Sequence, residues 1–145
     1  MQGPFHEFIL LPETGAHATQ SQHQVGLEHP LRLPHDLIWY LHDSLQWVES
    51  ENPAKHCELG QGLNLYGPTG FAGSGAALLG RILRAWAMLF SCGPPALSLR
   101  GGIDDRGEFC RDEFCRDEIV ELLNAIAEAA ERASHEGHWL LHLGV

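Results

Sequence analysis

The strongest hydrophobic pattern in the chain lies near its C-terminal end. Ile119, Leu123 and Ile126 recur at intervals of three and four residues, with polar side chains such as Glu121 between them. This spacing is typical of one face of an α-helix. Acidic residues before Ile119 suit the positive end of a helix dipole, and Gly137 stands where helices commonly end. The pattern therefore predicts a helix that contains this stripe and ends before Gly137.

Two further helices are predicted in the middle of the chain. Leu37, Leu41 and Leu45 form a second apolar stripe, which begins after Pro34 and is closed by Asn52-Pro53. A third segment, from Ser74 to about Ser91, is apolar on most of its faces. Such a segment is typical of a helix packed within the core rather than lying on its surface.

Four strands are expected to alternate with these helices. Residues 5–11 form an apolar run, and residues 62–66 and 96–100 alternate apolar with polar side chains as half-buried strands do. Residues 138–143 form the last strand, and the glycine pair at 101–102 is expected to break the third. Residues 12–34 are polar and rich in turn residues, so we expect a long irregular connection with a short strand near residues 25–27.

The order of these elements favours an α+β fold in a single domain covering residues 1–145. Alternating strands and helices commonly form parallel units. However, the half-buried alternation of two strands indicates that one sheet face is poorly covered. We therefore expect a two-layer arrangement, with three helices on one side of a sheet of about four strands, possibly mixed. A three-layer α/β fold is the alternative.

The net charge of −10 is spread unevenly. Residues 61–100 contain no acidic residue, whereas residues 101–145 contain eleven acidic residues against four arginines. The middle segment is therefore expected at the buried centre, between acidic flanks. Acidic surfaces repel nucleic acids and attract basic partners, although solubility alone is another explanation of the charge.

Composition also sets the expected compartment. No apolar run is long enough to span a membrane, and the first residues lack the basic start of a secretory signal, so we expect a cytoplasmic protein without membrane contact. The four cysteines show no CxxC pair, and we expect free thiols.

The first predicted helix carries the best candidate binding surface. Trp39 and Trp47 lie off its main apolar stripe, among three acidic side chains, Asp36, Asp43 and Glu49. Exposed aromatics among carboxylates are typical of a surface that binds another protein; burial against residues 12–34 is the alternative. The acidic run from Asp104 and Asp105 to Glu118 is a competing surface.

Other motifs give weaker indications of chemistry. The glycine-rich stretch Gly67–Gly75 precedes a helix, so a phosphate-binding small enzyme or ligand-binding domain is the alternative function, but the lysine of a P-loop is missing. No group of the ten histidines combines ligand spacing with nearby acids or cysteines. We expect no catalytic residues, metal or cofactor. An identical pentapeptide occurs twice in tandem, at 108–112 and 113–117, and we interpret it as a local duplication.

Four short segments resemble parts of a known class of proteins. They are Tyr66–Phe71, Trp86–Phe90, Arg116–Val120 and Leu140–Gly144. They are similar to segments of small bacterial immunity proteins, the partners of polymorphic or contact-delivered toxins. The resemblance implies a small acidic cytoplasmic protein that neutralises a toxin by direct binding, without enzymatic activity. It does not extend to the first 60 residues, and the tandem pentapeptide departs from it.

Overall fold

A computed structural model describes residues 3–12 and 29–145 of the chain. Within this part, six strands form one sheet in the order β2-β1-β8-β5-β3-β4, and every neighbouring pair is antiparallel. The strands are β1 (Phe5–Leu11), β2 (Leu31–Pro34), β3 (Glu49–Asn52), β4 (Glu58–Gln61), β5 (Pro68–Phe71) and β8 (Trp139–Leu143). A short 3-10 helix, η2 (Pro53–Lys55), joins β3 to β4.

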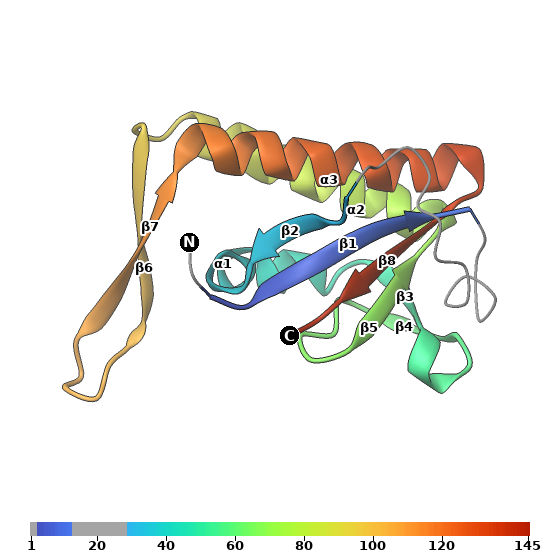
Figure 1. The fold of residues 1–145 in the computed structure, drawn as a ribbon, viewed down its shortest axis with the longest axis horizontal. Coiled ribbons are helices and arrows are strands. Elements are labelled where there is room, and N and C mark those ends of the chain that lie inside the picture. Colours follow the sequence, from blue (N-terminus) through green and yellow to red (C-terminus); the bar gives the residue numbers. More distant parts are fainter. Residues whose placement is uncertain (1–2, 13–28) are drawn as a thin grey trace.

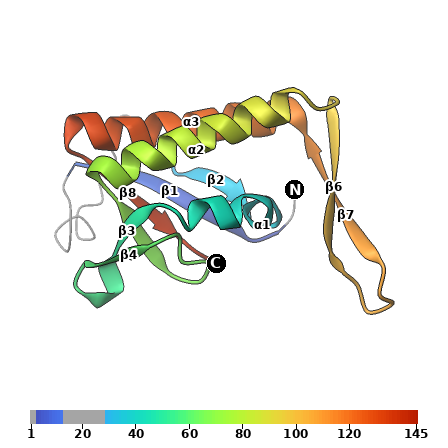
Figure 2. The same cartoon turned by 180° about the vertical axis from the view of Figure 1, so that it is seen from behind.

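The helices cover one face of this sheet. They are α1 (His35–Leu45), α2 (Gly73–Ser91) and α3 (Arg116–Glu136). The two long helices α2 and α3 lie side by side across the sheet (Figure 1), and α1 lies beside the strands below α2 (Figure 2). One apolar cluster contains buried residues of all three helices and of the central strands. The fold is therefore α+β with its helices on one side, and the three-layer alternative is wrong.

A separate two-stranded hairpin connects the two long helices. It consists of β6 (Ala96–Ile103) and β7 (Phe109–Cys115), which pair only with each other among the described strands. The hairpin extends away from the sheet at the end where α2 finishes and α3 begins (Figures 1 and 2). Its base is held where the backbone N–H of Arg116 donates to the carbonyl of Pro95, at 3.0 Å.

The predicted helical stripes are confirmed. In α3, Ile119, Leu123 and Ile126 are at most 1% exposed, and Gly137 ends the helix in the left-handed conformation, with φ of 68°. In α2, Gly80 faces α3, where a Cβ would lie 3.3 Å from the carbonyl oxygen of Ala127. The glycine therefore allows the two long helices to approach closely.

The predicted strands are only partly correct. Residues 62–66 are a turn rather than a strand, because Gly62 has a φ of 82° and Asn64 caps the backbone N–H of Tyr66. Their alternation arises because Leu63 and Leu65 pack on the core from a loop. The predicted strand over residues 96–100 is part of β6 and lies in the separate hairpin. The sheet instead gains β2, β3, β4 and β5, and so has six strands, all antiparallel, rather than about four.

The remaining differences concern segment ends. The expected irregular connection over residues 12–34 includes β2, which pairs with β1; the short strand expected near 25–27 lies outside the described residues. The first helix ends at Leu45, and Glu49, expected on its polar face, begins β3. The glycine pair at 101–102 does not end β6, because the strand continues through it to Ile103.

Replacing Gly70 with alanine is expected to lower the free energy of unfolding by about 1–3 kcal/mol. A Cβ at this position in β5 would overlap the indole ring of Trp139, which is completely buried. The matched control is Gly60→Ala in β4, where a Cβ meets no atom within 4 Å. Urea denaturation of both variants checks the prediction, and equal losses would contradict it.

Candidate functional site

A groove of about 620 Å³ separates α1 from the middle of the β6–β7 hairpin. Its walls come from segments that are far apart in the sequence: Asp36, Trp39, Tyr40, Arg100, Gly101, Gly102, Cys110 and Asp112. We refer to it as the α1–hairpin groove. Its α1 wall contains Asp36 and Trp39 from the first predicted binding surface. Its hairpin wall contains Asp112, which belongs to the competing acidic run.

The helical period explains the α1 wall. Trp39 and Tyr40 follow Asp36 by three and four residues, so the three side chains share one face of the helix. Leu37, Ile38 and Leu41 are fully buried on the other face. Trp39 remains 53% exposed, so the described residues do not bury it.

A β-bulge shapes the hairpin wall. Arg100 pairs with Arg111 and Ile103 with Phe109, so two glycines of β6 stand opposite Cys110 alone. Such an extra residue bends and twists a strand. Beside the bulge, the guanidinium of Arg100 lies 4.5 Å from the centre of the Phe109 ring. The hairpin wall therefore presents backbone and a positioned cation.

One hydrogen bond ties the two walls together. The hydroxyl of Tyr40 donates to Oδ2 of Asp112 at 2.9 Å. Burial, and then this bond to a carboxylate, raise the pKa of Tyr40 to about 12. Gly101 leaves room for the pair, since a Cβ there would lie 2.7 Å from the same carboxylate oxygen. This hydrogen bond within the protein therefore fixes the position of the two walls relative to each other.

The groove does not include every predicted residue. Asp43 and Glu49 are exposed outside it. Asp104 lies in the turn of the hairpin, where its carboxylate accepts the backbone N–H groups of Arg106 and Glu108 at 2.8 and 3.0 Å. Asp105 is exposed in the same turn. Only Asp36 and Trp39 of the predicted set line the groove.

Trp47 belongs to a second, apolar hollow of about 250 Å³. It is 67% exposed and faces α2, where Trp86 and Leu89 complete the hollow. The indole N–H of Trp86 donates to the hydroxyl of Ser44 at 2.9 Å, which fixes the floor. The two exposed tryptophans therefore serve different surfaces.

Arg100 was not predicted as part of a site, and neither was the contact between Tyr40 and Asp112, although Asp112 belongs to the competing acidic run. Nothing in the local pattern shows that α1 and β7 meet, because their contact joins residues 72 positions apart. The glycine pair carried a usable signal, since glycine inside a strand often marks a bulge. It was interpreted as the end of the strand.

Packing accounts for the glycines of the alternative phosphate site. Gly67–Gly75 is not a free loop, because it contains all of β5 and the first residues of α2. A Cβ at Gly67 would meet the side chain of Asn64, and one at Gly75 would overlap the backbone of Glu49. The glycine content is thus explained without a ligand.

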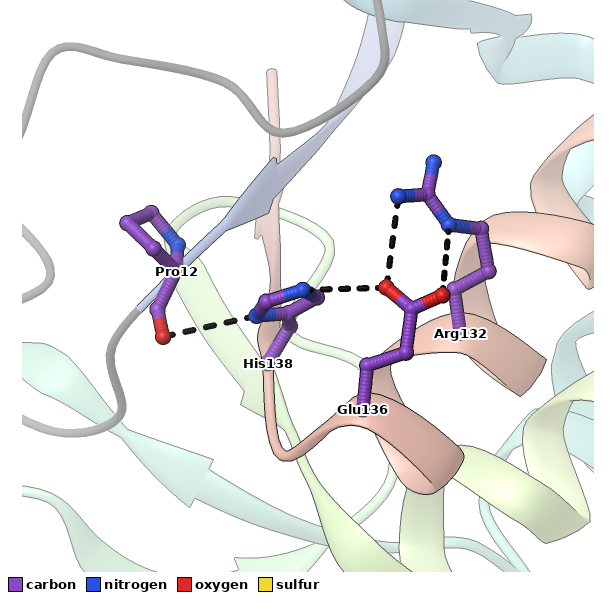
Figure 3. A network of polar contacts seen from close by, with 4 residues as sticks. All are labelled: Pro12, Arg132, Glu136 and His138. Carbon is purple, nitrogen blue, oxygen red and sulfur yellow. Dashed lines mark hydrogen bonds and ion pairs between the residues drawn. The ribbon is translucent and has the colours of Figure 1, made fainter.

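His138, near the C-terminus, takes part in ordinary polar contacts. His138 Nε2 lies 3.0 Å from the carboxylate of Glu136, which also pairs with Arg132 at 3.2 Å, and His138 Nδ1 lies 3.4 Å from the carbonyl oxygen of Pro12 (Figure 3). The hydrogen bond from Arg132 holds the pKa of Glu136 below its usual range. Within residues 3–12 and 29–145, no group of three or more histidine, cysteine or acidic side chains is arranged to hold a metal ion.

The tandem pentapeptide occupies two different environments. Its first copy lies mainly in β7, and its second spans the end of β7 and the start of α3. An offset of five residues reverses the face of a strand, so Phe109 is 54% exposed whereas Phe114 is 6% exposed. Cys110 and Cys115 are free thiols, as are Cys57 and Cys92.

The chain shows no match in comparisons with known proteins, whether protein-family models, curated proteins or solved structures. In the part of the chain that the structure describes, no helix combines the length and the apolar character that crossing a bilayer requires.

Proposed function

We propose that this chain is a non-enzymatic binding protein, and specifically an immunity protein that neutralises a basic bacterial toxin domain by direct binding in the cytoplasm. The observation that carries the proposal is Trp39, a large aromatic side chain left exposed in the α1–hairpin groove, whose lining also includes two carboxylates, Asp36 and Asp112.

The groove has the features of a protein-binding site. Tryptophan contributes more than most residues to binding energy when a partner covers it. The bond between Tyr40 and Asp112 fixes the walls before any partner arrives. A preorganised site loses less conformational entropy on binding. These features support binding.

Charge indicates the chemistry of the partner. The chain carries −10 at neutral pH, and β6, β7 and their turn contain five acidic residues against three arginines. Such a surface speeds the approach of a basic protein and repels nucleic acid. The proposed partner is therefore a toxin domain with a basic surface.

Replacing Asp36 with lysine is expected to slow association with the partner by about three- to tenfold while changing the dissociation rate little. Asp36 is exposed at the rim of the groove, where a reversed charge opposes a basic partner. The probe is a purified basic toxin domain, sought first among the products of the genes beside that of this chain. Binding kinetics over rising salt should show a falling association rate, because salt screens exposed charges.

The matched control is Glu58→Lys. This residue is exposed on β4, at the end of the molecule away from the hairpin (Figure 1), and its replacement makes the same change in net charge. It should slow association less than Asp36→Lys. Equal association rates at low and high salt, or equal effects of the two variants, would contradict a binding surface at the groove.

A further inference from the structure

Three histidines form a continuous hydrogen-bonded chain beneath α1. His142 Nε2 lies 2.7 Å from His6 Nδ1, and His6 Nε2 lies 2.8 Å from His35 Nδ1. The rings are nearly parallel, at 15° and 8°, with centres 5.0 and 5.1 Å apart. Since the nitrogens are only about half as far apart as the ring centres, the rings meet edge to edge. The three residues come from β8, β1 and the first position of α1.

The two ends of this chain have opposite environments. His142 and His6 are completely buried, whereas His35 is partly exposed. Nδ1 of His142 is the one buried side-chain nitrogen or oxygen within the described residues that lacks a hydrogen-bond partner. The chain thus runs from an unpaired buried nitrogen to a ring that water can reach.

Counting protons fixes the direction of the two hydrogen bonds. Three neutral imidazoles carry three N–H groups, and each bond requires one. The third N–H belongs either to His142 Nδ1 or to His35 Nε2. A buried N–H without an acceptor is rarer than a buried acceptor without a donor, so the proton resides on His35. All three rings therefore carry their proton on Nε2, and each bond points outward.

Taking up a fourth proton conflicts with this arrangement. If both bonds remain, the additional N–H must stand on His142 Nδ1, where it is buried without a partner. If His35 instead becomes doubly protonated while the inner rings stay as they are, its Nδ1–H faces the Nε2–H of His6, and the bond between them breaks. The partly exposed His35 can move into water, whereas His6 and His142 cannot.

Within the described residues, no carboxylate forms an ion pair with any of the three rings. Glu7 and Arg32 pair with each other at 2.9 Å on the opposite face of the sheet from His6. The neighbours of His142 on β1 and β5 are Phe8 and Thr69. The buried faces of α2 and α3 are apolar. Two further ionisable side chains lie on α1 itself. Asp36 follows His35 in the sequence, and the ring of His42 contacts Trp39.

Burial favours the neutral form of the buried histidines. It lowers the pKa of His6 from the ordinary 6.5 to about 4 and that of His142 to about 3, with repulsion from the neighbouring histidine adding to each. Because these folded pKa values are depressed, the stability that the chain contributes is fully present above pH 6.5 and is lost as pH falls toward 4.

The start of α1 depends on this contact. Pro34 provides no side-chain cap for the helix. The helix start is held by the backbone N–H of His35, which donates to the carbonyl of Pro4 at 3.1 Å, and by the ring of His35 against His6. The same ring packs edge-on against Trp39, with centres 5.7 Å apart.

We infer that the three hydrogen-bonded histidines, His142, His6 and His35, form a proton-sensitive latch. The latch holds the first turn of α1 in place at neutral pH, and it releases this turn when the three rings take up one additional proton. Release frees His35 and the contact that positions Trp39. The inference concerns the fold itself and does not depend on the proposed partner.

Hydrogen exchange of the isolated protein tests the latch. The backbone N–H groups of Trp39 and Tyr40 should bond to the carbonyls of His35 and Asp36 in the first turn. Protection factors, corrected for the intrinsic effect of pH, should fall about tenfold or more between about pH 7.5 and about pH 5, because only the open form binds the proton. Amides of Leu123 and Ile126 in α3 report whether the whole protein has opened.

Two variants separate the latch from other effects of acid. His35→Asn keeps a polar side chain that does not titrate, and it should reduce the change to within about threefold. His42→Asn, on the same helix and also against Trp39, should leave the change as in the unmodified protein. The inference is overturned if protection at Trp39 and Tyr40 is independent of pH, if His42→Asn removes the dependence, or if nitrogen NMR finds the proton of His142 on Nδ1 at neutral pH.

Discussion

Replacing Leu123 with alanine is expected to lower the free energy of unfolding by about 2–4 kcal/mol. The side chain is completely buried in the cluster that joins all three helices to the sheet. Its loss removes apolar contacts and leaves a cavity that the long helices cannot close without shifting. Urea denaturation, monitored by circular dichroism, measures the loss.

The matched control is the neighbouring residue, Leu122. It makes the same change of side chain when replaced with alanine, but it is only partly buried at the edge of the cluster. Its replacement should cost less than half as much as that of Leu123. Similar losses for the two variants would mean that the buried face of α3 is assigned incorrectly.

The helices could be predicted because their signals are local. The stripe of α3 repeats over its whole length of 21 residues, and the spacing alone determines which face is buried. The α+β class with helices on one face is correct, but the half-buried alternation used to predict it lies in a turn and in the separate hairpin rather than in the sheet. The burial of Leu123 and Ile126 in the structure confirms the predicted stripe of α3.

The short strands could not be predicted in the same way. β3 and β4 have four residues each, and every residue of β4 is exposed, so neither carries a hydrophobic period. Their pairing depends on η2 between them, where Asn52 caps the backbone N–H of Ala54. Conversely, Leu63 and Leu65 imitated a strand from within a turn, because loop side chains also pack on a core.

The candidate site likewise has one wall that local sequence patterns predict and one wall that they do not. Asp36 and Trp39 were predicted from one helix, because a helix shows which side chains share a face. The opposite wall requires the hairpin to fold back on α1, which no local pattern encodes. The histidine chain is a stronger example, since His6 and His142 are separated by 136 positions. Side chains brought together by sheet order become visible only in the structure.

The affinity of the toxin domain for variants of the two exposed tryptophans tests the proposed function most directly. Replacing Trp39 with alanine should weaken binding by about 30-fold or more, the effect of losing about 2 kcal/mol at an aromatic anchor. Trp47→Ala makes the same change of side chain in the separate hollow on α2, and it should weaken binding by less than about fivefold. Calorimetric titration of both variants measures the difference, after circular dichroism has shown that they fold. A toxin domain that bound Trp39→Ala as tightly as the unmodified chain would contradict binding at the groove.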